Sequence, residues 1–481
     1  MPPWQEDVCG LLARYARRDT TPSAVLDALH ERIARIDPML GAFCALDPTV
    51  LTAARASDRR WAEGRPCGAL DGVALIIKDN LVVRGLPASW GNAALATRPV
   101  AADELPVERL RSAGALLIGK ANTPEFAVEG YTGNRHFGVT GNPFAPALTP
   151  GGSSGGVAAA VAAGLASAGI GTDGGGSIRR PAGFCGLVGL KPGLGRVARA
   201  GGLPQLLLDF EVVGPLCRSV RDAALLFGVL RGAHRDDPVS RASVVSDPVT
   251  RAGASTDAST DASDGRLRRI LVVPRRGERP VDASVAAALE RARAVLERSG
   301  CTCHEGQLPF ETALASLDAG WRHLAEIGLA ALFARDEGIA RSAAPRYRAM
   351  AERGRALPAT CLWDLLEGVR TLRAEVGRMF ADVDAILMPT SAAMPWPAAE
   401  PFPTRIAGRE VGARAHAVFT GWVNASGHPA LALPAPCGAG DLPIGVQLVA
   451  DLGDDEALLA LGERYERGTG GHVWPALATG P

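Results

Sequence analysis

The chain has 481 residues, and its 51 Lys plus Arg equal its 51 Asp plus Glu, so it carries no formal net charge. This balance offers no field to attract nucleic acid or an anionic membrane, and neither partner is expected. The 47% of hydrophobic residues can build a large core, yet no run of 18 apolar residues predicts a transmembrane helix. The acidic N-terminus lacks the apolar stretch of a secretory signal, so we expect a cytoplasmic protein.

The first 120 residues predict helices that alternate with short strands. Thr21 followed by Pro22 suits a helix start. Apolar periodicity and short apolar runs predict, in chain order, helices over 5–36 and about 48–62, a strand over 73–77, a helix over about 104–112 and a strand over 115–118. Two strands separated by a helical pattern indicate a parallel α/β sheet.

The second half of the chain repeats the mixture of strands and helices. Residues 238–264 lack aromatic and large apolar side chains, which predicts a disordered, solvated surface insert. The remaining predictions are strands over 269–273, 385–388, 430–433 and 445–449, and helices over 281–299, 311–335, 360–380 and 455–466.

The nine cysteines are an odd number spread over a long chain, which argues against a disulfide framework. Cys301 and Cys303, followed by His304, form a close pair, but no partners stand at metal-ligand spacing elsewhere. No metal site is therefore predicted.

Residues 150–195 are rich in Gly, Ala and Ser and contain two motifs that suggest chemistry. Gly151–Gly156 fits the nucleophile elbow G-x-S-x-G, centred on Ser153 or Ser154. Three prolines between 142 and 150 argue against the strand that should enter such an elbow. Gly169–Gly174 matches the dinucleotide motif G-x-G-x-x-G, but no acidic residue follows about 20 positions later.

Other single residues are candidates only in the right surroundings. The glycines Gly174–Gly176 leave the backbone amides before Ser177 uncovered, so these amides could converge on an oxygen that gains negative charge. Lys78 follows an apolar strand, and it would be a base only if burial lowered its pKa from about 10.4. His136 and His428 show no pattern of a general base and are interpreted as structural or surface residues.

Several sequence segments follow one another in a fixed order along the chain. They are Lys78–Asn80, Lys120–Phe126, Thr149–Gly156, Ala158–Gly164, Gly171–Arg179, Pro181–Gly186, Gly189–Pro192, Met388–Thr390 and Asn424–Ala430. Together they resemble the amidase signature family over roughly residues 20–470. The serines Ser153 and Ser177 are 24 positions apart, as they are in the family.

The resemblance implies one large α/β domain, an α/β/α sandwich around a large mixed twisted β-sheet. Residues 1–65 would be a helical segment packed on the core, and 66–233 the amidase signature core. Residues 234–266 would be a disordered insert, and 267–481 the C-terminal part of the same domain. The resemblance implies no cofactor.

The resemblance also implies a Ser–Ser–Lys triad. Ser177 would be the nucleophile that forms the acyl-enzyme, Lys78 the base, and Ser153, preceded by a cis peptide bond from Gly152, the bridge between them. The backbone amides of Gly174, Gly175, Gly176 and Ser177 would form the oxyanion hole. The family often has Thr or Ile at the position of Gly174.

Substrate contacts are less defined by the sequence. Arg179 matches a frequent arginine of the family and is expected to pair with Asp173. Arg180 is either a carboxylate-binding residue or a second structural arginine. Tyr131 and Trp422 are expected as pocket walls, because they fall in segments that line the pocket in the family.

The function implied is hydrolysis of a small-molecule amide through an acyl-enzyme, releasing ammonia or an amine and a carboxylic acid. One alternative is a glutaminase-type subunit of a tRNA-dependent amidotransferase. Others are a catalytically inactive scaffold and an α/β-hydrolase that uses Ser153 with His428. A homodimer is a common expectation for the family, and the substrate remains open.

Overall fold

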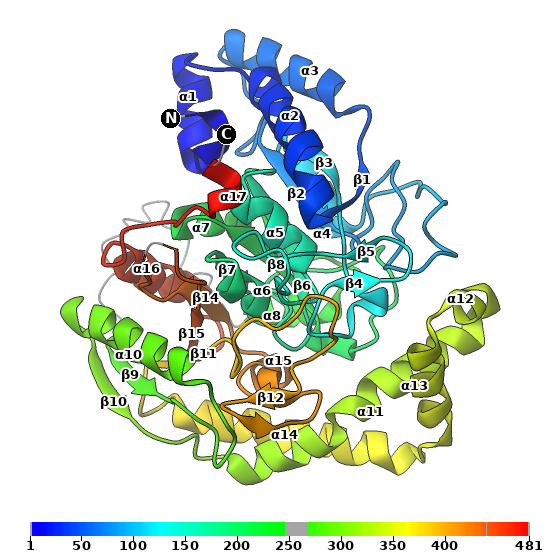
Figure 1. Ribbon diagram of the computed structural model, residues 1–481, viewed down its shortest axis with the longest axis vertical. Helices are drawn as coiled ribbons and strands as arrows, with labels where there is room; N and C mark the ends of the chain where they lie inside the picture. The colour runs from blue at the N-terminus through cyan, green and yellow to red at the C-terminus, as the bar shows by residue number, and fades with distance from the viewer. Residues whose placement is uncertain (1, 246–266, 439, 480–481) are drawn as a thin grey trace.

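The computed structural model describes residues 2–245, 267–438 and 440–479. Its centre is an eleven-stranded sheet in the order β1-β3-β2-β6-β8-β7-β14-β15-β11-β9-β10 (Figure 1). The strands are β1 (Phe43–Leu46), β2 (Ala74–Lys78), β3 (Leu116–Ala121), β6 (Ala168–Asp173), β7 (Val188–Lys191), β8 (Val212–Cys217), β9 (Arg269–Val272), β10 (Thr302–Glu305), β11 (Ala385–Pro389), β14 (Ala430–Pro434) and β15 (Gly445–Ala450).

The sheet is mixed. β2 runs parallel to both β3 and β6, and β9 runs parallel to both β10 and β11. The other neighbours in the order are antiparallel, among them β6 with β8 and β14 with β15. Because strands from both halves of the chain share one sheet, the expected fold class, an α/β/α sandwich around a mixed sheet, is confirmed.

Helices cover both faces of the sheet, which makes three layers. The sixteen helices lie at α1 (Val8–Arg17), α2 (Pro22–Leu40), α3 (Val50–Ala62), α4 (Leu105–Ser112), α5 (Gly155–Ala162), α6 (Arg179–Phe184), α7 (Val220–Leu230), α8 (Pro238–Val245), α10 (Ala283–Arg298), α11 (Glu311–Arg335), α12 (Glu337–Ser342), α13 (Pro345–Ala356), α14 (Ala359–Met379), α15 (Gly421–Ser426), α16 (Asp455–Glu466) and α17 (Ala476–Thr479) within the described residues.

Strand β2 shows why the sheet needs both helical layers. Its side chains Leu75 and Ile77 join a core with α4, α7, α10 and α16, while Ala74 and Ile76 join a core with α2, α3 and α5 on the opposite face. A strand buried on both faces has a continuous apolar sequence, which is why this segment could be predicted.

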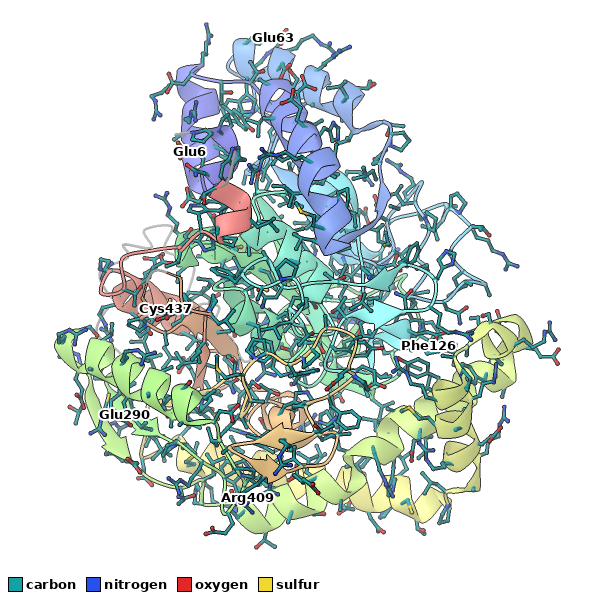
Figure 2. The ribbon with its side chains drawn as sticks, viewed as in Figure 1. Glu6, Glu63, Phe126, Glu290, Arg409 and Cys437 are labelled. Carbon is teal, nitrogen blue, oxygen red and sulfur yellow. The ribbon has the colours of Figure 1, made fainter. Side chains whose placement is uncertain are left out.

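Helices α11, α12 and α13 form an arm at the lower right of Figure 1, while α14 runs along the bottom of the view and packs in a core with β11 and β15. Phe126, labelled in Figure 2, packs edge-on against Phe333 of α11 and Tyr347 of α13 and attaches this arm to the core. The two chain ends lie close together at the opposite side of the molecule (Figure 1), where Arg32 of α2 donates a hydrogen bond to the carbonyl oxygen of Ala478 in α17 at 3.0 Å.

The predicted strands and long helices are confirmed, with ends that differ by a few residues. The start of α2 is as predicted, since the Thr21 side chain accepts a hydrogen bond from the Ala24 amide. The prediction of a disordered insert is wrong for its first residues, because Pro238–Val245 form α8. The rest of that insert, 246–266, lies outside the described residues.

Candidate active site

Lys78 is the last residue of β2, the third strand of the sheet, which lies between β3 and β6. Its side chain is 0% exposed, and its Nζ lies 2.8 Å from Ser153 Oγ, 2.8 Å from Thr172 Oγ1 and 3.3 Å from the Thr172 carbonyl oxygen. Burial lowers the pKa of Lys78 from 10.5 to about 7, because no water solvates the ammonium form. The sequence left open whether Lys78 is buried, and the structure shows that it is.

Thr172 on β6 is a residue whose role the sequence did not indicate. Its hydroxyl oxygen accepts from Lys78 and also from Asn80 Nδ2 at 3.1 Å. This fixes the lysine amine at the end of its strand. The available signal was position alone, since Thr172 stands directly before Asp173 in the Gly171–Arg179 segment.

Ser153 lies in the loop that leads into α5, and the peptide bond from Gly152 to Ser153 is cis, as the resemblance implied. A Cβ at Gly152 would overlap the carbonyl oxygen of Tyr131, so only glycine fits there. Thr123 Oγ1 donates to the Ser153 carbonyl oxygen at 2.9 Å. Ser153 is 1% exposed and contacts Lys78 from a fixed backbone.

Ser177 stands between β6 and α6 and is 7% exposed, at the wall of a cavity. Its carbonyl oxygen accepts from the Ser154 amide at 3.1 Å, which joins the two serine loops. Within the described residues its Oγ makes no hydrogen bond, to Ser153 or to another group. Catalytic hydrogen bonds are often unformed without substrate, and a serine hydroxyl changes rotamer rapidly.

Asp173 holds the loop that carries Ser177. Its carboxylate accepts from the Gly176 amide at 2.6 Å, the Ile178 amide at 3.1 Å and Arg179 Nε at 3.0 Å, so the expected Arg179 pair is confirmed. Burial alone would raise the pKa of Asp173, but Arg179 and the other donors hold it well below its ordinary value.

This network corrects the expected oxyanion hole. The expectation that the Gly176 amide belongs to the oxyanion hole is wrong, because this amide already donates to the Asp173 carboxylate. In the described part of the chain the amides of Gly174, Gly175 and Ser177 donate to no protein acceptor. Three amides on one short loop thus remain available to a substrate oxygen.

Arg180 is buried, and its guanidinium donates to the carbonyl oxygen of Gly175, to Thr420 Oγ1 at 2.8 Å and to the Gly152 carbonyl oxygen at 3.3 Å. These bonds tie the Ser177 loop to the residue before Ser153. Among the described residues, the buried Nε of Arg180 has no hydrogen-bond partner.

The cavity beside Ser177 has a volume of about 330 Å³. Its wall combines the Gly174–Gly175 loop with residues from α11, α13 and the 401–417 segment, including Trp321, Met350, Phe402, Arg414 and His416. None of these five was predicted, because they are remote in sequence from the signature segment. His416 is buried, and burial lowers its pKa well below the usual value, so its imidazole is neutral.

Tyr131 and Trp422, predicted as walls, do not line this cavity. The Tyr131 hydroxyl accepts from Arg346 at 2.6 Å, so the arginine covers it. Trp422 is 1% exposed, packs on Phe310 and borders a neighbouring cavity instead.

His136 and His428, the two histidines considered from the sequence, make no hydrogen bond to Ser153 or Ser177 among the described residues. His136 is exposed, and His428 is buried 3.0 Å from Ser426 Oγ and 3.3 Å from Asp451. Residues 140–150, which precede the Gly151 turn, contain no strand. The alternative of an α/β-hydrolase using Ser153 with His428 is therefore wrong.

Neither a membrane-spanning helix nor a metal-binding cluster lies in the described ranges. None of the helices there combines the length and hydrophobicity needed to cross a bilayer. No group of three or more His, Cys, Asp and Glu side chains in those ranges is placed to hold a metal ion.

Comparison with known proteins gives a consistent result. A family profile described as Amidase matches residues 24–459. A glutamyl-tRNA(Gln) amidotransferase subunit of Thermus thermophilus is 34% identical over 481 residues, covering 95% of this chain and 96% of that protein. A bacterial aryl acylamidase of the amidase signature family superposes with a TM-score of 0.88 at 26% identity, covering 100% of both chains. For a peptide amidase in complex with chymostatin the TM-score is 0.81 at 27% identity, covering 99% of this chain and 100% of that one.

The sheet, the coverage and the similarity define this chain as a hydrolase of the amidase type. It belongs to the amidase signature family.

Proposed function

We propose that this protein hydrolyses a carboxamide bond, with Ser177 as nucleophile, Ser153 as proton bridge and Lys78 as base. One observation carries the proposal: a fully buried lysine amine lies 2.8 Å from Ser153 Oγ, and Ser177, whose loop is joined to the Ser153 loop, lines a cavity. A serine hydroxyl is a poor nucleophile until a base takes its proton, and a lysine with a pKa of about 7 can be that base at neutral pH.

Proton transfer follows from the hydrogen-bond inventory. The neutral amine of Lys78 has two N–H donors, which the two oxygens of Thr172 accept, and one lone pair. That lone pair accepts the proton of Ser153, whose oxygen accepts the proton of Ser177 once the Ser177 hydroxyl rotates toward it. Thr172 therefore sets the direction of transfer.

The Ser177 oxygen then attacks the amide carbon, and the carbonyl oxygen gains a negative charge that the amides of Gly174, Gly175 and Ser177 stabilise. When the C–N bond breaks, the proton returns through Ser153 to the leaving nitrogen, which departs as ammonia or an amine. Water attacks the ester on Ser177 by the same relay, and the carboxylic acid is released.

Arg180 has two proposed roles. Its three hydrogen bonds hold the Ser177 loop at a fixed position relative to the Gly152 carbonyl group. Its Nε–H donor has no acceptor among the described residues, and the Nη2 donors lie on the same edge of the guanidinium. A substrate carboxylate near the scissile bond could accept both.

A second candidate function is favoured by one comparison. Relatives 34% identical over nearly the whole chain are named as a glutamyl-tRNA(Gln) amidotransferase subunit. By that analogy the chain would hydrolyse glutamine and transfer the ammonia to a partner protein. Glutamine hydrolysis that requires such a partner supports this alternative, and turnover of simple amides by the isolated chain supports the first.

The first test is labelling of the purified protein with a fluorophosphonate probe, followed by peptide mass spectrometry. The expected adduct is on Ser177, because only an activated serine reacts. An adduct on Ser153 would show that the nucleophile is a different serine, and a protein without any adduct that hydrolyses no amide would contradict the proposed function.

A further inference from the structure

The charges around the Ser177 cavity do not balance. Five arginines and two glutamates line it. Glu326 pairs with Arg353 at 2.7 Å, and Glu129 lies 4.0 Å from Arg346. Arg180, Arg322 and Arg414 remain, and in the described chain none of the three has a carboxylate within ion-pair distance.

A second cavity of about 440 Å³ adjoins the first. The two cavities share five lining residues, which we call the partition: Trp321, Arg322, Ala413, Arg414 and Ala417. The second cavity also has Arg276 and Arg279, but both pair with Asp318, at 3.0 and 2.7 Å. Among its described lining residues, the guanidiniums without a carboxylate partner are thus again Arg322 and Arg414.

The partition has the composition of an anion site. The Arg414 guanidinium lies over the Trp321 ring, 5.0 Å from its centroid, which holds its plane in a fixed orientation. Arg322 is the next residue on α11. Both residues are exposed and line both cavities, and a planar guanidinium can donate two parallel hydrogen bonds to a carboxylate.

The cavity beside Ser177 also has an apolar part to its wall. Leu207, Ala325, Met350 and Phe402 line the first cavity together with Trp321. Such a wall suits a hydrocarbon or aromatic linker, while the polar groups at its ends fix the orientation of the ligand.

We propose that Arg322 and Arg414 on Trp321 form a distal anion subsite, and that the substrates are amides carrying a carboxylate separated by an apolar linker from the scissile carbonyl. The identification of these amides as substrates rests on the proposed function. The binding of an anion at the subsite does not depend on catalysis. Arg180, close to Ser177, is not part of the subsite.

Binding is therefore measured apart from catalysis, by calorimetry with the Ser177→Ala variant. The ligands are the monoamides of succinic, adipic and suberic acid, each compared with its neutral methyl ester. For at least one length we expect the carboxylate to bind about tenfold or more tightly than the ester, a typical gain from a charge-assisted pair. Adding Arg414→Gln or Arg322→Gln should remove the preference, and raising the salt concentration should weaken it.

The matched control is Arg298→Gln at the end of α10, an exposed arginine outside both cavities, which should keep the preference. Equal binding of acid and ester at every length, no binding of either, or a preference that survives both cavity substitutions would overturn the inference.

Turnover by the unmodified chain separates the two proposals. Hydrolysis of amides regardless of charge contradicts only the subsite, whereas absent Ser177 labelling and absent turnover contradict the proposed function even if the binding preference is found.

Discussion

Replacing Lys78 by methionine tests the burial on which the proposed chemistry depends. Methionine keeps much of the apolar stem but has no amine, so hydrolysis should be lost. The free energy of unfolding should nevertheless rise at low pH, because the parent protein must bury an ammonium group that the variant lacks.

The pKa of Lys78 sets the size of the expected change in the free energy of unfolding. The folded-state pKa of Lys78 is about 7, against 10.5 for the free side chain. Between these values the unfolded chain binds a proton that the folded chain does not, so the cost is full below pH 7 and declines as pH rises. At 1.36 kcal/mol per unit, the cost is about 5 kcal/mol at pH 6 and about 2 kcal/mol at pH 9. Three hydrogen bonds lost at about 1 kcal/mol each leave the variant about 2 kcal/mol more stable at pH 6 and about 1 kcal/mol less stable at pH 9.

The assay is urea unfolding of parent and variant at both pH values, with other titrating groups cancelling between the two proteins. Lys120→Met is the control, since Lys120 is also buried but lies 3.4 Å from Asp79, and its loss should destabilise the protein at both pH values. A Lys78→Met variant that is less stable at pH 6, or a stability difference that does not change with pH, would refute the reasoning.

Four further predictions concern the same site. The kcat/KM for an amide should fall below about pH 7, as Lys78 becomes protonated, and a pH-independent profile would exclude it as the base. Thr172→Val should lower kcat at least tenfold with little change in KM, because Lys78 loses an acceptor, while Thr172→Ser should keep most activity; equal rates for the two would contradict the positioning role. Gly152→Ala should inactivate the protein, because the new methyl group overlaps a backbone carbonyl, whereas Gly228→Ala, with open space around it in α7, should leave activity intact and raise stability by up to about 1 kcal/mol. Arg180→Ala should lower kcat and raise KM for acidic amides; an unchanged KM would remove its contact with substrate.

Prediction of the fold from sequence worked for several of the strands that carry large apolar side chains. Ala74–Lys78 and Gly445–Ala450 are such strands, and both were predicted. Ala168–Asp173 was not, although it is an inner strand of the sheet next to β2. Its glycines are required because α5 packs so closely that a Cβ at Gly169 would overlap Val157, and that requirement is invisible without the tertiary structure.

The sequence by itself determined the chemical groups and their order: a lysine at a strand end, two serines 24 positions apart, and glycines before the second serine. These are local patterns, which neighbouring residues make recognisable. The tertiary structure alone decided that Lys78 is fully buried, that the Gly176 amide is engaged with Asp173, and that Trp321 and Arg414, 93 residues apart, meet in one cavity wall. Burial and long-range contact depend on how distant elements pack, and a pKa, a free amide or a pocket charge follows from that packing rather than from the identity of the residue.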